Sequence, residues 1–167
     1  MVGKWDRWHT TRDEPNQFGM KVTYEKAVEW LDLPGAQLED WGGGTGFASK
    51  FVRQAQYSLV DGSQSKFVDK IVDLTTYRTS VECILMRHVL EHNHEWRAIL
   101  DNMLASWTMR GAIVFFEPFV EETVLVRKQF PSYAFSREDV AMPIIAAGVT
   151  TREEQFGSET IWFLSRA

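Results

Sequence analysis

The sequence has one cysteine, no long apolar run and no surplus of basic residues, and each absence excludes a class of protein. Only Cys83 is a cysteine among the 167 residues, so no intrachain disulfide can form, which fits a reducing cytoplasm. No apolar stretch approaches the roughly 20 residues that a membrane helix needs, and Asp6 comes too early for a signal peptide. We therefore expect a cytoplasmic protein with no membrane partner.

The charge of the chain is mildly acidic and is not concentrated in one segment. The formal net charge is −5, and the 18 lysines and arginines are scattered along the sequence. A protein that grips a phosphate backbone usually carries a basic surplus or a basic stripe. Nucleic acid is therefore a disfavoured partner and a small molecule the expected one, while the oligomeric state is left open.

The size and apolar content of the chain favour one packed domain. Hydrophobic residues make up 44% and aromatic residues 13% of the sequence, which is enough to bury a core and argues against disorder. We expect a single domain over residues 1–167, with its core in 23–167 and an N-terminal lid or edge segment in 1–22. Trp5 and Trp8 should pack that segment on the sheet edge or on a ligand pocket.

Helical patterns recur at four places between residues 23 and 148. Thr23 can cap a first helix, whose apolar stripe has helical spacing and consists of Tyr24, Ala27, Val28 and Leu31. A second helix is predicted from Phe47, and a third over 96–107, closed by residues 110 and 111. Ser136 and Asp139 form a capping pattern for a fourth, in which Pro143 should produce a kink or an early stop.

Strand patterns fill the gaps between these helices. The predicted strands are 37–40, 57–61, 70–73, 82–87 and 112–117, followed by an antiparallel hairpin of 150–155 and 159–164. Strands separated by helices form a mostly parallel sheet through right-handed crossovers. We therefore expect an α/β three-layer sandwich in which the C-terminal hairpin adds an antiparallel edge strand. Segments 1–22 and 118–135 should be loops that cover a ligand and select it.

A glycine-rich turn connects the first predicted strand to the helix after it. The segment is Asp40-Trp41-Gly42-Gly43-Gly44-Thr45-Gly46. Alternate glycines let the backbone bend tightly and approach a ligand, and the exposed N–H groups favour an anionic group. Asp40 offers a negative charge to an ammonium group or a polar hydrogen. A dinucleotide site would need glycine at Phe47 or Ser49, so the G-x-G-x-x-G fingerprint fails in both registers.

Acidic residues end the next two predicted strands. Asp61, followed by Gly62 and Ser63, ends the second strand, where a carboxylate can accept both hydroxyls of a ribose. Asp73 and Leu74 end the third strand and could meet the edge of an adenine. Aspartate is also common at strand ends because it stabilises turns, and this alternative applies most to Asp73.

Together these motifs resemble those of class I S-adenosylmethionine-dependent methyltransferases. The segment from Asp40 to Gly46 is similar to their D-x-G-x-G-x-G loop, and Val60-Asp61-Gly62-Ser63 resembles their second motif. Met86-Arg87-His88-Val89-Leu90-Glu91-His92 resembles the HVLEH segment frequent after the fourth strand of small-molecule members. Residues 111–119 resemble the strand after their PGG turn. The similarity extends over residues 36–119 and does not specify a substrate.

The resemblance implies S-adenosylmethionine as the cofactor. The cofactor-binding residues that it implies are Asp40, Gly42, Gly44, Gly46, Asp61, Gly62, Asp73, Leu74 and Arg87. The glycines would border the methionine part, Asp61 would hold the ribose, and residues 73 and 74 would meet the adenine. Arg87 and His88 would lie at the pocket mouth, near the transferring methyl group.

Two residues depart from the family pattern. Glu39 occupies a strand position that is usually apolar, and Trp41 replaces a smaller residue. An unpaired buried carboxylate is strongly unfavourable, so Glu39 must have a partner or lie nearer the surface.

The chemistry of a sulfonium methyl needs little from the protein. Its leaving group is neutral, so the enzyme chiefly aligns the acceptor and excludes water. A base matters only when the acceptor must lose a proton, and the candidates for that role are His88, His92 and Glu117, with Glu91 beside them. Each could instead have a surface or helix-capping role.

The sequence also offers a possible metal site and two alternative functions. His88 and His92 have ligand spacing if they are helical, but a helix beginning near residues 93 and 94 breaks that geometry, so we expect no metal. The leading hypothesis is a methyltransferase acting on a small molecule. A non-catalytic cofactor-binding domain is the alternative, and a nucleotide-binding oxidoreductase is disfavoured by the glycine spacing.

Overall fold

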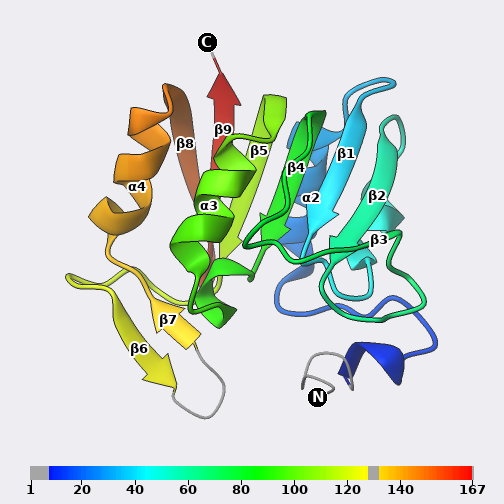
Figure 1. The fold of residues 1–167 in the computed structure, drawn as a ribbon, viewed down its shortest axis with the longest axis horizontal. Helices are drawn as coiled ribbons and strands as arrows, with labels where there is room; N and C mark the ends of the chain where they lie inside the picture. Colours follow the sequence, from blue (N-terminus) through cyan, green and yellow to red (C-terminus); the bar gives the residue numbers. More distant parts are fainter. Residues whose placement is uncertain (1–7, 128–131, 167) are drawn as a thin grey trace.

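The computed structural model describes residues 8–127 and 132–166; Trp5 lies outside them. Figure 1 shows the arrangement of the elements. The helical elements are α2 (Lys21–Leu31), the 3-10 turns η1 (Phe47–Phe51) and η2 (Leu90–His92), α3 (Trp96–Leu104) and α4 (Arg137–Ala146). The strands are β1 (Gln37–Trp41), β2 (Gln56–Asp61), β3 (Lys70–Ile71), β4 (Val81–Arg87), β5 (Trp107–Phe115), β6 (Val124–Arg127), β7 (Ser132–Ala134), β8 (Val149–Phe156) and β9 (Glu159–Arg166).

The predicted three-layer α/β sandwich is confirmed. Within the described residues, seven strands form one sheet in the order β3-β2-β1-β4-β5-β9-β8. β1 to β5 pair in parallel, and β9 runs antiparallel to both β5 and β8. The hairpin therefore inserts β9 into the sheet and leaves β8 at the edge. In Figure 1, α3 and α4 lie in front of the sheet and α2 lies behind it.

Strand β4 shows why the sheet needs layers on both sides. Cys83 and Leu85 point toward the core beneath α2, whereas Ile84 and Met86 point toward the core beneath α3. All four side chains are fully buried, as expected for a central parallel strand without polar alternation. The unbroken apolar run that predicted this strand is thus divided between two hydrophobic cores.

The first helix begins earlier than the capping pattern predicted. α2 starts at Lys21, and the preceding Met20 gives no side-chain cap. Thr23 lies inside the helix, where its hydroxyl is within hydrogen-bond distance of two acceptors, Met20 O at 2.7 Å and a carboxylate of β9. The prediction of Thr23 as the cap is therefore wrong, while the predicted apolar stripe is buried.

Two other helix predictions need correction. The helix expected from Phe47 is only the 3-10 turn η1, in which Ala48 is the buried side chain. α3 ends at Leu104, and Trp107 begins β5 instead of continuing the helix. Trp107 is buried in the same core as the helix stripe. Its spacing from Met103 and Leu104 fits a helix, but the chain has already turned when it reaches Trp107.

The region predicted as a long loop contains an antiparallel pair of strands. β6 and β7 pair with each other and form a small second sheet, which lies at the lower left of Figure 1. The Ser136 cap of α4 is confirmed, because its hydroxyl accepts a hydrogen bond from Asp139 N. The helix continues through Pro143 to Ala146, so the predicted early stop is not found.

The parallel strands all end on one side of the sheet. Figure 1 shows their arrowheads pointing toward the residues that precede α2 and toward the β6–β7 hairpin. In open α/β sheets ligands bind beyond these carboxyl ends. No helix in the described ranges is long and apolar enough to cross a membrane.

Candidate functional site

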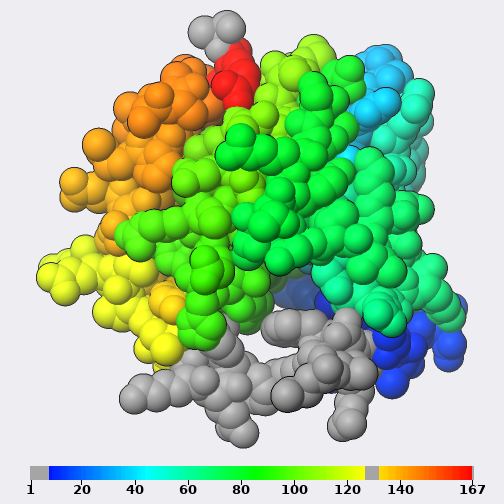
Figure 2. Space-filling view, in the orientation of Figure 1, coloured from blue at the N-terminus to red at the C-terminus, as the bar shows by residue number. Residues whose placement is uncertain are grey.

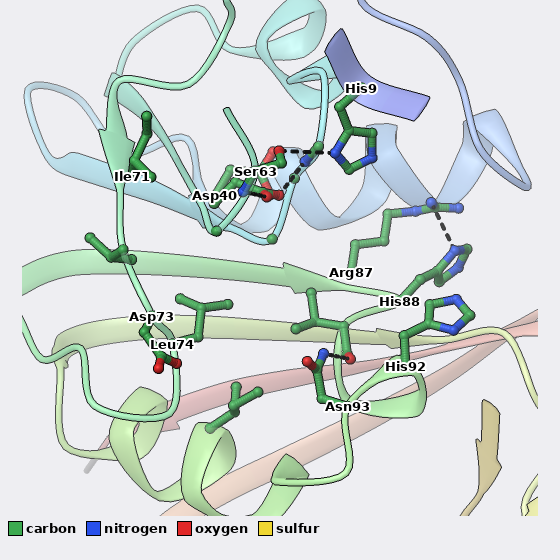
Figure 3. Close-up of a pocket in the computed structure, with 18 of the residues that line it drawn as sticks. His9, Asp40, Ser63, Ile71, Asp73, Leu74, Arg87, His88, His92 and Asn93 are labelled. Carbon is green, nitrogen blue, oxygen red and sulfur yellow. Dashed lines mark hydrogen bonds between the residues drawn. The ribbon is translucent and has the colours of Figure 1, made fainter. Parts of the chain in front are cut away.

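A cavity of about 710 Å³ lies beyond the carboxyl ends of β1, β2 and β4, and Figure 3 shows the residues around it. Its volume is within the range of small-molecule sites. The predicted site residues that line it are Asp40, Gly42, Gly44, Asp61, Gly62, Asp73, Leu74, Arg87, His88 and His92. Gly46 and Glu117 are not among the lining residues. The sequence motifs that follow the four strands β1 to β4 therefore meet in one space.

The glycine loop is the floor of this cavity. Gly44 has a φ of 61°, in the left-handed region that favours glycine. A Cβ on Gly43 would lie 2.3 Å from Asp40 Oδ2, so the backbone approaches that carboxylate too closely for any side chain. Gly46 precedes η1 and also has a positive φ. Thus Gly46 shapes the exit from the turn, whereas Gly44 borders the cavity.

Asp40 is a buried carboxylate whose hydrogen bonding is incomplete. It is 2% exposed, and Tyr57 donates a hydrogen bond of 2.7 Å to its Oδ2. Oδ1 is buried and has no hydrogen-bond partner among the described residues. Burial, with a smaller contribution from nearby Asp61, raises the pKa of Asp40 to about 6. A buried oxygen without a donor is unfavourable, so this wall of the cavity is suited to a ligand that brings one.

Asp61 connects the end of β2 to the glycine loop. Its Oδ2 accepts a hydrogen bond of 2.9 Å from Gly44 N, and its Oδ1 accepts one of 2.7 Å from Ser63 N. Each carboxylate oxygen has a second lone pair that can accept a ligand hydroxyl. Asp61 thus fixes the loop and still offers acceptors to the cavity.

The segment after β3 forms a more apolar wall. Ile71, Val72 and Leu74 line the cavity together with Asp73. The side chain of Asp73 is held in a turn, since its Oδ1 accepts hydrogen bonds from Thr75 N and Thr75 Oγ1. Those bonds lower the pKa of Asp73. The turn-stabilising role considered for Asp73 and its position at the cavity therefore coexist.

Arg87, at the end of β4, is paired with a carboxylate that the sequence did not point to. Its Nη2 lies 2.8 Å from Glu159 Oε2, and both side chains are almost fully buried. Glu159 also accepts hydrogen bonds from Met20 N and the Thr23 hydroxyl. Burial alone would raise the pKa of Glu159, but His88, Thr23 and Arg87 together lower it to about 2. Arg87, Glu159 and Thr23 thus form a buried hydrogen-bonded cluster that joins β4, β9 and α2 beside the cavity.

His88 lies against the same cluster, next to Arg87 and Glu159. It has a φ of 57°, which is uncommon for a residue with a side chain. Nδ1 lies 3.2 Å from Arg87 Nη1, and Nε2 lies 3.3 Å from Glu159 Oε1 without hydrogen-bond alignment. Burial, with Arg87 and His92 nearby, lowers the pKa of His88 to about 4. The imidazole is therefore neutral at pH 7, and both nitrogens face protein groups.

The other proposed acid–base residues differ in their contacts and in whether they line the cavity. His92 lines the cavity, with its ring stacked on Phe116 at 5.1 Å. Glu117 instead accepts a hydrogen bond of 3.0 Å from Ser132 at the β6–β7 hairpin. Glu91 is buried and accepts a hydrogen bond from Phe116 N, and burial raises its pKa to about 8. Among the described residues, no group of three or more metal-ligating side chains is assembled.

The two departures from the family pattern explain one another. Glu39 is buried, and Trp41 Nε1 donates to its Oε2 at 2.8 Å. Lys70 Nζ and the Tyr77 hydroxyl donate to Oε1 at 2.6 and 3.1 Å. The predicted need for a partner is therefore met by three donors, one of them the unusual tryptophan.

Solved structures of similar fold come from several enzymes. A Burkholderia thailandensis 1,6-didemethyltoxoflavin-N1-methyltransferase, with bound 1,6-didemethyltoxoflavin and S-adenosylhomocysteine, is 16% identical, with a TM-score of 0.72 over 88% of this chain and 77% of that one. A Synechocystis PCC 6803 magnesium protoporphyrin IX methyltransferase with bound S-adenosylmethionine is 18% identical, with a TM-score of 0.68 over 98% and 91%. The chain has the class I methyltransferase fold. No family model and no curated protein matches its sequence.

The class I methyltransferase fold does not by itself specify the reaction. The [4+2]-cyclase SpnF has the same fold, with 14% identity and a TM-score of 0.69 over 87% of this chain and 80% of that one. Function must therefore be argued from the site.

Several residues that line this cavity were missed from the sequence. They include His9, Phe18, Tyr24, Ser63, Val89 and Asn93. His9 and Phe18 come from the segment before α2, which carries no motif. Ser63 and Val89 stand inside the quoted motifs but were not assigned to the site, because the resemblance gave them no role.

Proposed function

We propose that this protein is an S-adenosylmethionine-dependent methyltransferase that acts on a small molecule, and that it works in the cytoplasm. The observation that carries the proposal is the pairing of a glycine loop with two acids across one cavity. Among the described residues, Asp40 has a buried oxygen without a donor. Asp61 offers acceptors and contacts Gly44, although the two residues are 17 positions apart in sequence. These residues fit a ligand that carries an ammonium group at one end and a ribose further along.

The residues divide the work of holding such a ligand. Gly42 and Gly44 would border the amino-acid part, whose ammonium group would supply a donor for Asp40. Asp61 would accept from the ribose hydroxyls, and the wall from Ile71 to Leu74 would pack against the adenine. The bound cofactor would supply a sulfonium methyl group that is already activated for transfer.

The acceptor would lie on the other side of the cavity, near Arg87, His88 and His92. His88 stays neutral and is engaged by Arg87 and Glu159, which suits positioning better than proton transfer. His92 is therefore our candidate for a base when an acceptor must lose a proton. The main work of the protein would be alignment and exclusion of water.

A non-catalytic binding domain of the same fold is the second candidate. Proposed acid–base groups are engaged within the fold, as His88 is by Arg87 and Glu117 is by Ser132. This arrangement is compatible with methyl transfer that needs no base, and also with cofactor binding that has lost turnover.

Two measurements test the proposal in sequence. Calorimetry should show binding of S-adenosylmethionine and S-adenosylhomocysteine and no binding of NAD. Absence of both heat and a melting-temperature rise with either adenosyl ligand would remove the proposal. Incubation with radiolabelled S-adenosylmethionine and a pool of extracted metabolites should then transfer label to a small molecule. Binding without any transfer would favour the non-catalytic domain.

A further inference from the structure

The N-terminal segment places a histidine directly on the glycine loop. His9 is buried and lines the cavity. A Cβ on Gly44 would lie 2.8 Å from His9 Nε2, so this ring atom is the nearest neighbour of the loop at that point. His9 Nδ1 lies 3.0 Å from Ser63 Oγ, a contact drawn in Figure 3. The imidazole therefore spans the gap between the glycine loop and the segment after Asp61.

The segment that carries His9 is fixed to the core at several points. Asn16 N donates to Thr45 Oγ1 at 2.8 Å, which ties the segment to the glycine turn itself. Phe18 N donates to the Tyr24 hydroxyl at 3.3 Å, and the ring of Phe18 packs edge-on against His9. Figure 2 shows the blue N-terminal residues against the part of the chain that follows β2. His9 is therefore positioned by contacts on both sides of the cavity.

We propose that His9 recognises the carboxylate of the cofactor's amino-acid part through Nε2, which makes residues 8–18 part of the cofactor site. The inference rests on the proposed function. When Ser63 donates to Nδ1, the ring proton is on Nε2, next to Gly44. An N–H donor at that position complements a carboxylate, whereas Asp40 complements the ammonium group of the same ligand. The amino-acid part would then be bound between His9 and Asp40.

The experiment compares two ligands that differ only in the amino-acid part. S-adenosylhomocysteine carries the carboxylate, while 5′-methylthioadenosine has the same nucleoside and sulfur without it. His9→Asn keeps a polar group near Nδ1 and removes Nε2, whereas His9→Gln places an amide N–H near the Nε2 position. We expect His9→Asn to weaken S-adenosylhomocysteine binding at least tenfold by calorimetry and to leave 5′-methylthioadenosine binding within twofold. His9→Gln should restore part of the loss.

A matched control is His94→Ala, because His94 is exposed and contacts Tyr133 away from the cavity lining. It should bind both ligands like the wild-type protein. Equal losses for both ligands in His9→Asn would mean that His9 only supports Ser63, and unchanged affinities would mean that it makes no contact; either result overturns the inference. A wild-type protein that binds neither ligand would instead overturn the proposed function, and the inference with it.

Discussion

Two of the buried carboxylates near the cavity, those of Asp40 and Glu159, have opposite electrostatic environments. Asp40 and Glu159 are each 2% exposed. Asp40 has one oxygen that meets no donor in the part of the chain that the structure describes, and burial raises its pKa to about 6. Glu159 accepts hydrogen bonds from Arg87 and Thr23 and lies beside His88. These neighbours lower its pKa to about 2 despite burial.

Whether a buried carboxylate is compensated by the protein distinguishes ligand-binding groups from groups that stabilise the fold. A carboxylate whose charge is compensated within the protein stabilises the folded state where it is ionised. A carboxylate without such compensation lowers stability, and evolution retains it most readily where a ligand brings the missing donor. Asp40 belongs to the proposed cofactor side, and Glu159 to the framework on the acceptor side.

The largest effect should come from breaking the framework. Glu159→Gln leaves Arg87 buried without its counter-charge, so we expect the free energy of unfolding to fall by about 3–5 kcal/mol in urea denaturation. The matched control is Glu153→Gln, which weakens the partly exposed pair with Arg137 and should lose less than about 1 kcal/mol. Equal losses in the two variants would contradict the special status of Glu159.

Neutralising Asp40 should have the opposite sign. The folded-state pKa is raised, so the folded protein binds more protons than the unfolded chain between pH 3.8 and about 6. Stability contributed by Asp40 therefore falls as pH rises through that window. Asp40→Asn should raise the free energy of unfolding by about 1–3 kcal/mol at pH 8, and this gain should become smaller toward pH 4. The same variant should bind S-adenosylhomocysteine more weakly. Denaturation curves across this range check the sign, and a loss at pH 8 would refute it.

The cofactor side could be predicted from the sequence because its signals are local. The glycine turn lies between a strand and a helical turn, and Asp61 ends the next strand, so parallel topology alone brings them together. Apart from β6 and β7, which lie in a segment predicted as a loop, the order of helices and strands followed from patterns of the same short range. The overlap of helical spacing with the start of β5 at Trp107 shows where such patterns fail.

The framework side could not be predicted, because its contacts join distant parts of the chain. Arg87 and Glu159 are separated by 72 positions. Sequence distance also hid His9 on the cofactor side, because its contact Ser63 is 54 positions away. Glu159 stands at the start of a strand, where nothing in the neighbouring residues indicates a buried acid. Its partner becomes evident only once β9 is inserted beside β5.

The ribose acid should show a smaller effect that is confined to binding. Asp61→Ala removes two acceptors from the cavity, so we expect S-adenosylhomocysteine affinity to fall more than tenfold, about 1.4 kcal/mol or more. Asp69→Ala is a suitable control, since Asp69 also accepts from a backbone N–H, that of Leu59, but does not line the cavity. Calorimetry should show normal affinity for Asp69→Ala. Unchanged affinity in Asp61→Ala would remove that residue from the site.

The smallest effect should come from trimming a compensated acid on the cofactor side. Glu39 has three donors, so Tyr77→Phe removes one and leaves Lys70 and Trp41 in place. We expect a loss of about 0.5–1.5 kcal/mol in stability and unchanged affinity for S-adenosylhomocysteine.

Tyr57→Phe is the equivalent change at Asp40, because it removes the hydroxyl that donates to that carboxylate. There the pKa of the carboxyl should rise further, and binding of S-adenosylhomocysteine near pH 6 should weaken. Equal affinity of the two phenylalanine variants at pH 6 would mean that Asp40 and Glu39 do not differ in their effect on binding. The proposed division between ligand-binding and structural acids would then be wrong.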